Sequence, residues 1–340
     1  MIKLGIIYGG ISTEHDISKM SAKSIIENLD KTKYEIKEIY INKQGKWFEI
    51  NGKEKVELHN LIVTLKELDV IFPVLHGLGG EDGTIQGLFE MIQRPYVGCG
   101  VLASSIGMDK VYTKIIFEKA KIPQAKYIYI KKIENSYSII NEQFNEEEFD
   151  IDKIIEKIKF PMFVKPSNSG SSVGVKKAKN KEELKQAIEN AAQFDNKILV
   201  EQGIEAKEVE CAILQDRENV VASTVGEIKS AEEFYSYDAK YNEPESKTII
   251  PANISEKQRE KIKELAIKAF KAIDGKGLAR VDFFIEKETN KIYINEINTM
   301  PGFTQISMYP KLFEAVGVSY TNLLDKLVKN ELQNTRQKDK

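Results

Sequence analysis

The sequence predicts an open parallel α/β sheet at the N-terminus, followed by two domains of α+β type. In the first third of the chain, short apolar strand segments alternate with helical segments, an order typical of a parallel sheet. Further along, strand segments follow one another closely, as in antiparallel sheets. A chain of 340 residues is long enough for two or three domains. We expect domains over 1–105, 106–197 and 198–333, with a frayed tail at 334–340.

Apolar runs that end in Gly-containing or polar loops indicate the strands of the first domain. Strands are expected at 2–8, 34–41, 69–75 and 95–98, and helices at 12–29 and 84–93. In a parallel sheet, ligand groups lie on loops at the carboxyl ends of the strands. Two such loops carry ionisable groups, Glu14 in one and His76, Glu81 and Asp82 in the other. Helix capping explains the first loop equally well when it is taken alone.

The later domains have less regular patterns. A helix is expected at 109–120, before Pro123. The stretch 130–159 is dense in Glu, Asn and Lys, which favours a solvated helical or loop excursion. Further strands are expected at 160–165, 173–177, 198–202, 208–214, 220–228, 278–286 and 291–298, and further helices at 181–193, 255–273 and 312–332.

Composition excludes several functional classes. Fifty basic and fifty-two acidic residues leave a net charge of −2, whereas a nucleic-acid-binding protein usually has a basic excess. No apolar run approaches the ~18–20 residues of a membrane helix, and the first residues lack the shape of a signal peptide. Cys99 and Cys211 are expected to be reduced core thiols, and three histidines are too few for a zinc site. We therefore expect a cytoplasmic enzyme with small-molecule substrates and no nucleic-acid or membrane partner.

Two consecutive strand segments near the C-terminus carry an unusual set of polar side chains. A two-residue turn between them would set Asp282 opposite Ile297 and bury it, whereas a three-residue loop, or a bulge at Asn290, would set it among the other polar groups. Carboxylate and amide oxygens favour magnesium, and an arginine beside them favours a phosphate. A half-exposed hairpin face is the alternative. The set consists of Arg280, Asp282, Glu296 and Asn298.

A Gly/Ser-rich loop at 165–174 lies between two strand segments. Free backbone amides of small residues can fold over phosphates, and Lys165 at the strand end adds positive charge. The loop is not a Walker A motif, because it joins two strands instead of opening a helix. Together with the polar strands it predicts a flexible flap over ATP; a plain turn is the alternative.

A second glycine motif, 98–103, fits the G-x-G-x-x-A pattern of dinucleotide-binding proteins. Its context is poor, because no acidic residue follows a later strand at the required spacing. A nicotinamide dehydrogenase is therefore a weaker alternative.

Six short motifs occur in order along the chain: GGISTEHDIS at 9–18, HGLGGEDG at 76–83, KPSNSGSSVG at 165–174, YSYDAKY at 235–241, RVD at 280–282 and NEINTMPG at 295–302. Together they resemble the D-alanine–D-alanine ligase family of the ATP-grasp superfamily. The resemblance runs from residue 2 to about 325, and the order of the six motifs makes it specific.

The resemblance implies an ATP-grasp fold of three domains, with ATP held between the second and third. It implies that ATP phosphorylates the carboxylate of one D-alanine, after which the amino group of a second D-alanine displaces phosphate from the acyl phosphate. The dipeptide would serve peptidoglycan precursor synthesis. The resemblance also implies Mg²⁺ or Mn²⁺, as two ions, and a cytoplasmic homodimer.

Site residues follow from the same resemblance, position by position. It implies that the metal is held by Asp282, Glu296 and Asn298, and the nucleotide by Lys110, Lys165, Ser171, Ser172, Glu201, Glu208 and Lys240. Glu14 would bind the ammonium group of the first D-alanine, with His76 nearby. Arg280 and the Gly302 amide would stabilise the oxyanion, and Ser307 with Lys240 would bind the second carboxylate. Tyr241 and Ser171 would bond to Glu14 and fasten a mobile loop.

Two positions depart from the family pattern. Ser236 stands where the family often has Asp, and Met300 fills an often small position before Pro301. Tyr241 resembles ligases that use D-alanine as second substrate. The alternatives that stay open are ligation of D-alanine to D-serine or D-lactate, and a nucleotide-binding regulator that has lost catalysis.

Overall fold

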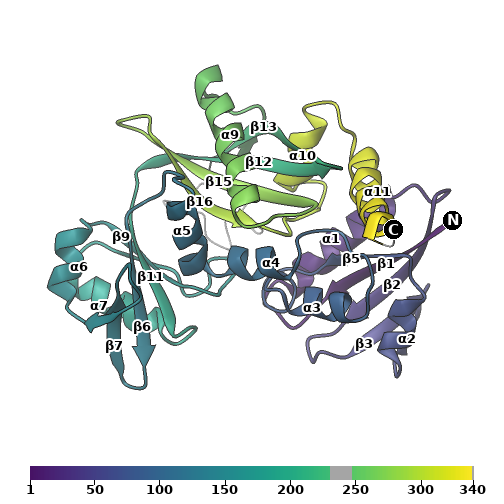
Figure 1. The fold of residues 1–340 in the computed structure, drawn as a ribbon, viewed down its shortest axis with the longest axis horizontal. Helices are drawn as coiled ribbons and strands as arrows, with labels where there is room; N and C mark the ends of the chain where they lie inside the picture. Colours follow the sequence, from purple (N-terminus) through teal and green to yellow (C-terminus); the bar gives the residue numbers. More distant parts are fainter. Residues whose placement is uncertain (230–246, 339–340) are drawn as a thin grey trace.

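The structure, a computed structural model, describes residues 1–229 and 247–338. Its strands form three sheets, which follow one another along the chain as an N-terminal, a central and a C-terminal sheet. In Figure 1 the N-terminal sheet (purple) and the central sheet (teal) lie at opposite ends of the molecule. The C-terminal sheet (green) lies above the helices that link them. The domain boundaries at 105/106 and 197/198 stay predictions.

The N-terminal sheet is parallel at its centre, as expected, and is extended by an antiparallel hairpin. Its order is β4-β3-β2-β1-β5, in which β1 pairs in parallel with β2 and β5. The strands are β1 (Ile2–Gly9), β2 (Tyr34–Ile41), β3 (Trp47–Asn51), β4 (Glu54–Glu57) and β5 (Val70–Val74). The strand expected at 95–98 is reduced to an isolated bridge between Tyr96 and Ile71.

Helices cover both faces of this sheet, because β1 directs apolar side chains to both of its faces. Leu4 and Ile6 pack with α1 (His15–Asn28) and α11 (Tyr320–Lys338), whereas Ile7 packs with α2 (Leu61–Lys66) and α3 (Thr84–Met91). The C-terminal helix therefore completes the core of the N-terminal unit (Figure 1). This helix also runs beyond the end expected at Leu332.

The central sheet has the order β10-β9-β11-β6-β7-β8. It follows the linking helices α4 (Val101–Met108) and α5 (Lys110–Lys119) and contains β6 (Tyr127–Ile133), β7 (Ser136–Ile140), β8 (Glu146–Glu148), β9 (Met162–Pro166), β10 (Lys176–Ala178), β11 (Lys197–Gln202), α6 (Ile151–Lys157) and α7 (Lys181–Ala191). Because β11 belongs to it, this sheet continues past the boundary expected at 197/198.

The segment 130–159 is not the solvated excursion that its charge suggested. It forms the end of β6, the strands β7 and β8, and helix α6, and Ile130, Ile139 and Ile154 are buried in the central core. The buried isoleucines are separated by charged residues on the outer face. That pattern is typical of a half-buried sheet, and the high local density of charge obscured it.

The C-terminal sheet is antiparallel throughout, with the order β14-β13-β12-β15-β16. Its elements are β12 (Ala206–Asp216), β13 (Asn219–Lys229), β14 (Lys247–Ile249), α9 (Glu256–Ala272), β15 (Leu278–Glu286), β16 (Ile292–Asn298) and α10 (Met308–Glu314). Helix α9 begins with a capping box, in which Ser255 and Gln258 satisfy each other's backbone amides. It packs against one face of the sheet.

A bulge in β16 decides which of its side chains face α9. Ile294 and Ile297 are both buried in the core beneath α9, although residues three apart on a regular strand point to opposite faces. The pairing register skips Asn295, because Phe283 is opposite Ile294 while Asp282 is opposite Glu296. One extra residue thus keeps both isoleucines in the core and turns the intervening polar groups to the other face.

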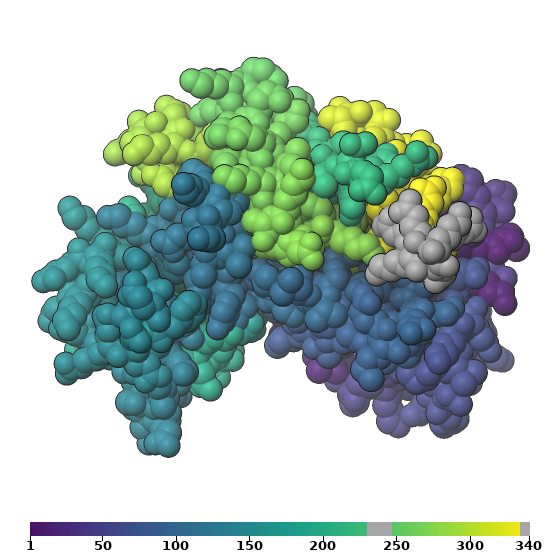
Figure 2. All heavy atoms as spheres, viewed as in Figure 1, coloured from purple at the N-terminus to yellow at the C-terminus, as the bar shows by residue number. Residues whose placement is uncertain are grey.

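Figure 2 shows a hollow between the central unit (teal) and the N-terminal unit (purple and blue), below the segment that links them. Over the described ranges, no helix is long and apolar enough to cross a membrane.

Ile297→Ala tests the packing that this bulge produces. Ile297 is 2% exposed, so truncation should lower the free energy of unfolding by about 2–5 kcal/mol. Ile292→Ala on the same strand removes a side chain that is only partly buried and should cost less. Urea unfolding followed by far-UV circular dichroism measures both, and equal costs would contradict the assignment.

Candidate active site

The four polar side chains of β15 and β16 share one face of the C-terminal sheet. The register sets Arg280 opposite Asn298 and Asp282 opposite Glu296, and directly opposed residues of antiparallel strands point to the same side. Asp282 therefore lies among the polar groups, as expected for a three-residue loop or a bulge, but this register has another origin. Residues 287–290 form the turn between the paired Glu286 and Lys291, and the shift comes at Asn295 instead.

Arg280 is the electrostatic centre of this face. Its Nε and Nη2 donate to the two carboxylate oxygens of Asp282 at 2.8 and 2.7 Å, and Asn298 Nδ2 donates to Asp282 Oδ2 at 3.1 Å. Burial alone would lower the pKa of the guanidinium, but Asp282, Glu210 and Glu296 raise it well above its ordinary value. Arg280 is therefore charged at any physiological pH.

Glu210 is a member of this face that the sequence interpretation missed. It lies on β12 opposite Asp282, and its Oε2 is 3.1 Å from Arg280 Nε. Only 4% of the residue is exposed. Glu208, expected at the nucleotide, lies two residues earlier on the same strand and face, opposite Phe284. The alternation of polar and apolar residues along β12 could have indicated Glu210 from the sequence.

The charges of this face suit a divalent cation. Three carboxylates, on Glu210, Asp282 and Glu296, act on the single guanidinium of Arg280, so negative charge is in excess. The expected ligands are two carboxylates and an amide, and oxygen donors of this kind are those that Mg²⁺ prefers. Within residues 1–229 and 247–338, no three His, Cys, Asp or Glu side chains are grouped to hold a metal by themselves.

Lys165 and Glu201 face this sheet from the central one. Lys165 Nζ lies 2.6 Å from Glu201 Oε2, and Lys114 Nζ, which was not expected at the site, lies 2.5 Å from Glu201 Oε1. Burial opposes the charge on Glu201, but the two ammonium groups hold the pKa of its carboxyl at about 2. Burial likewise opposes the charge on Lys165, and Glu201, Glu296 and Glu208 raise its pKa. The two sheets are therefore electrostatically coupled across the site.

The Gly/Ser loop begins at the end of β9 and is anchored to helix α5. Lys110 Nζ donates to the Ser169 carbonyl at 2.6 Å, and the Lys110 amide donates to the Ser167 carbonyl. Ser171 and Ser172 both have positive φ angles, 48° and 59°, so the backbone turns sharply at the tip of the loop. Ser171 Oγ donates to Glu14 Oε1 at 2.5 Å. The expected link between loop and Glu14 is therefore present.

Glu14 lies where the N-terminal unit meets this loop. A Cβ atom built on Gly77 would stand 2.6 Å from Glu14 Oε2, and one on Gly170 would stand 2.7 Å from it. Two glycines from different units thus leave room for the carboxylate, and a larger residue at either position would displace it.

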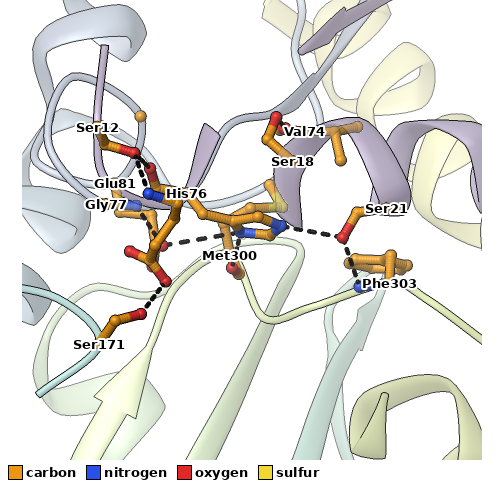
Figure 3. A network of polar contacts seen from close by, with 12 residues as sticks. Ser12, Ser18, Ser21, Val74, His76, Gly77, Glu81, Ser171, Met300 and Phe303 are labelled. Atoms are coloured by element: carbon orange, nitrogen blue, oxygen red, sulfur yellow. Dashed lines mark hydrogen bonds and ion pairs between the residues drawn. The ribbon is translucent and has the colours of Figure 1, made fainter. Parts of the chain in front are cut away.

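His76 and Glu81 lie close to each other (Figure 3), with His76 Nδ1 3.9 Å from Glu81 Oε1, and Glu14 acts on the pKa of both groups. Burial lowers the pKa of the His76 imidazole, with Glu14 and the Met300 carbonyl opposing and Arg280 adding to the decrease. Burial and, to a smaller extent, Glu14 raise the pKa of the Glu81 carboxyl to about 8, although the hydrogen bond from the Gly77 amide opposes this increase. His76 is therefore neutral at pH 7 and Glu81 is largely protonated.

Gly302 and Ser307 lie together in the segment that joins β16 to α10. A Cβ on Gly302 would stand 2.9 Å from Ser307 Oγ, so the glycine is required for this close approach. Ser307 is the N-cap of α10, and its Oγ accepts a hydrogen bond from the Thr304 amide at 3.0 Å. Lys240 and Tyr241, as well as the departure at Ser236, lie outside the described residues.

Three features together define an ATP-dependent ligase of the ATP-grasp class. They are the Gly/Ser loop, the two lysines that contact Glu201, and the carboxylate-bearing face of the C-terminal sheet. The family models for the N- and C-terminal parts of D-ala D-ala ligase match residues 3–62 with 51–99, and 116–329. The chain therefore belongs to the D-alanine–D-alanine ligase family.

Individual relatives agree with this assignment. The chain is 50% identical to a D-alanine–D-alanine ligase of Acetivibrio thermocellus, over 95% of this chain and 94% of that one. It is 30% identical to the Bacillus anthracis D-alanine–D-alanine ligase solved with ATP, with a TM-score of 0.79 over 99% and 100% of the chains. It is 33% identical to the VanG D-Ala:D-Ser ligase of Enterococcus faecalis, with a TM-score of 0.84 over 97% and 99%.

Glu201→Gln should destabilise the protein because it leaves two buried ammonium groups without their carboxylate. At pH 7 the free energy of unfolding should fall by about 3–5 kcal/mol. The folded-state pKa of Glu201 is lowered from 4.5 to about 2, so its contribution is present above pH 4.5 and is lost as the pH falls toward 2. The difference between variant and wild type should shrink over that interval.

Urea unfolding at a series of pH values measures this difference. The matched control is Glu205→Gln, which breaks an exposed pair with Lys287 and should change little. A difference that stayed constant from pH 7 to pH 2 would contradict the assigned role of Glu201.

Proposed function

We propose that this protein joins two molecules of D-alanine to D-alanyl-D-alanine at the expense of ATP, for peptidoglycan precursor synthesis. One observation carries the proposal: the face of the C-terminal sheet that bears Arg280 adjoins the group formed by Glu14, His76 and Glu81. Both Glu14 and Arg280 act on the pKa of the His76 side chain, so an ammonium-binding carboxylate and a phosphate-binding guanidinium share one site. The activity is the one named for the relatives of this chain.

The first step requires a D-alanine carboxylate beside the γ-phosphate of ATP. Glu14 binds the ammonium group of that D-alanine, and Ser171 holds the flap against Glu14. An oxygen of the substrate carboxylate attacks the γ-phosphorus, the bond to ADP breaks, and an acyl phosphate forms. Lys165, Lys110 and the amides around Ser172 supply positive charge and hydrogen-bond donors to the phosphates, with Glu201 and Glu208 as further nucleotide contacts.

The second step joins the two amino acids. The amino group of the second D-alanine attacks the acyl carbon, and a tetrahedral oxyanion forms and collapses with loss of phosphate. In this proposal Arg280 and the Gly302 amide donate to that oxyanion. Ser307, which lies against Gly302, binds the carboxylate of the second D-alanine together with Lys240.

Asp282, Glu296 and Asn298 are the residues that would hold Mg²⁺ or Mn²⁺, as two ions. When bound, the metal neutralises phosphate charge during transfer. We also propose a homodimer located in the cytoplasm, on the strength of the family resemblance.

A second-substrate panel tests the proposal. Phosphate release from ATP is measured with D-alanine alone, and with D-alanine plus D-serine or D-lactate, and the products are separated by chromatography. D-alanyl-D-alanine should dominate. Preference for D-serine would favour the activity of the VanG relative, and preference for D-lactate would overturn the assignment in the same way. Tight ATP binding without phosphate release would favour a regulator.

Glu296→Gln should abolish turnover, because it removes one negative charge from the proposed metal ligands. Steady-state phosphate release at saturating Mg²⁺ measures this, and activity within about tenfold of wild type would contradict the role. Glu14→Gln is the matched control. It removes the same charge from the other end of the site and should chiefly raise the KM for D-alanine, while the Mg²⁺ dependence stays unchanged.

A further inference from the structure

Ser21 lies on α1, within the core of the molecule, and takes no part in the steps described above. It is fully buried, and its hydroxyl is bonded to two groups from distant parts of the chain (Figure 3). Ser21 Oγ is 3.1 Å from His76 Nε2, and it accepts a hydrogen bond from the Phe303 amide at 3.3 Å. His76 Nδ1 is 3.0 Å from the Met300 carbonyl oxygen.

The polarity of these bonds allows only one arrangement for a neutral imidazole. A carbonyl oxygen can only accept, so His76 Nδ1 carries the proton and donates to Met300. Nε2 is then an acceptor, and the Ser21 hydroxyl donates to it. The lone pairs of Ser21 Oγ can then accept the hydrogen bond that the Phe303 amide donates. Each donor in the chain of bonds therefore has an acceptor, without conflict.

The two ends of this chain of bonds lie on either side of Gly302. The segment reads Met300-Pro301-Gly302-Phe303, and Pro301 has no amide hydrogen to donate. Toward α1, the segment is held at the Met300 carbonyl through His76 and at the Phe303 amide through Ser21. Phe303 is itself fully buried, and its carbonyl accepts from the Tyr320 hydroxyl. The Gly302 peptide is thus fixed from both sides.

We propose that Ser21 is a positioning residue, which orients the Gly302 amide toward the reacting carbonyl by way of His76 and Phe303. The inference rests on the proposed function. An oxyanion donor works only if it is fixed before the charge develops, and a misplacement of about 1 Å can cost about a hundredfold in rate. Substrate binding makes no such demand on Gly302, so the effect falls on kcat.

Ser21→Ala is the test, and Ser18→Ala is its control. Ser18 is also fully buried on α1, but its hydroxyl bonds to the Gly9 amide and the Val74 carbonyl, within the N-terminal unit. We expect Ser21→Ala to lower kcat by about tenfold to a hundredfold, with the KM values for ATP and for the first D-alanine within about twofold of wild type. Ser18→Ala should keep kcat at temperatures where it remains folded.

Hydrogen exchange of the intact protein provides a readout that does not depend on activity. Peptides covering 300–303 should exchange faster in Ser21→Ala than in wild type or Ser18→Ala. Equal kcat values for the two variants would overturn the proposal, and so would a loss of kcat without faster exchange in this segment. If the wild type made no dipeptide while 300–303 still exchanged faster in Ser21→Ala, the proposed function would be refuted. The role of Ser21 in fixing the Gly302 peptide would remain.

A double-mutant cycle separates the relay from independent effects. His76→Asn retains a donor near the position of Nδ1 but removes Nε2, the acceptor for Ser21. In that background Ser21→Ala should lower kcat by a smaller factor than in wild type, because the two residues act through one chain of bonds. Equal factors in both backgrounds would contradict the relay.

Discussion

The site depends on the register that sets Asp282 opposite Glu296. Like charges directly opposed on neighbouring strands repel each other, so this pairing has a cost unless cations compensate it. Arg280 supplies one cation, held by two bonds to Asp282 and close to Glu210. The remaining negative charge is what makes the face suited to a metal–phosphate complex. A single residue, Asn295, maintains the register, since it allows the isoleucines of β16 to stay in the core.

The other half of the site is assembled from parts that are distant in sequence. Glu14 comes from the first loop of the N-terminal unit, His76 from a later loop of the same unit, and Ser171 from the flap of the central one. Glu14 and His76 come together within the N-terminal unit, and Ser171 reaches Glu14 only when the central unit is in contact with it. In the proposed function, binding of the first substrate and closure of the flap are therefore linked through one carboxylate, because Ser171 donates to the group proposed to bind the ammonium.

Regular elements were predictable from the sequence, and irregular ones were not. Strands 34–41 and 278–286 have the bounds expected from the sequence, because apolar residues recur along them at a regular spacing. The segment 130–159 was misinterpreted, since its buried isoleucines are outnumbered by charged neighbours. Glu210 and Lys114 were missed because a buried charge looks like a surface charge until its partner is known. The bulge was missed because alternation was assumed to hold along all of β16.

The docking of α11 against the N-terminal sheet has a consequence for biosynthesis. Leu323 and Leu324 share a core with Leu4 and Ile6, although the central and C-terminal sheets lie between them in the sequence. A nascent chain on the ribosome cannot complete that core until α11 has been synthesised, after both other sheets, so the first-domain-first folding order common among multidomain proteins is unavailable to it. Premature termination before Tyr320 would leave the apolar face of β1 uncovered, and such fragments should be substrates for chaperones and proteases rather than partly working enzymes.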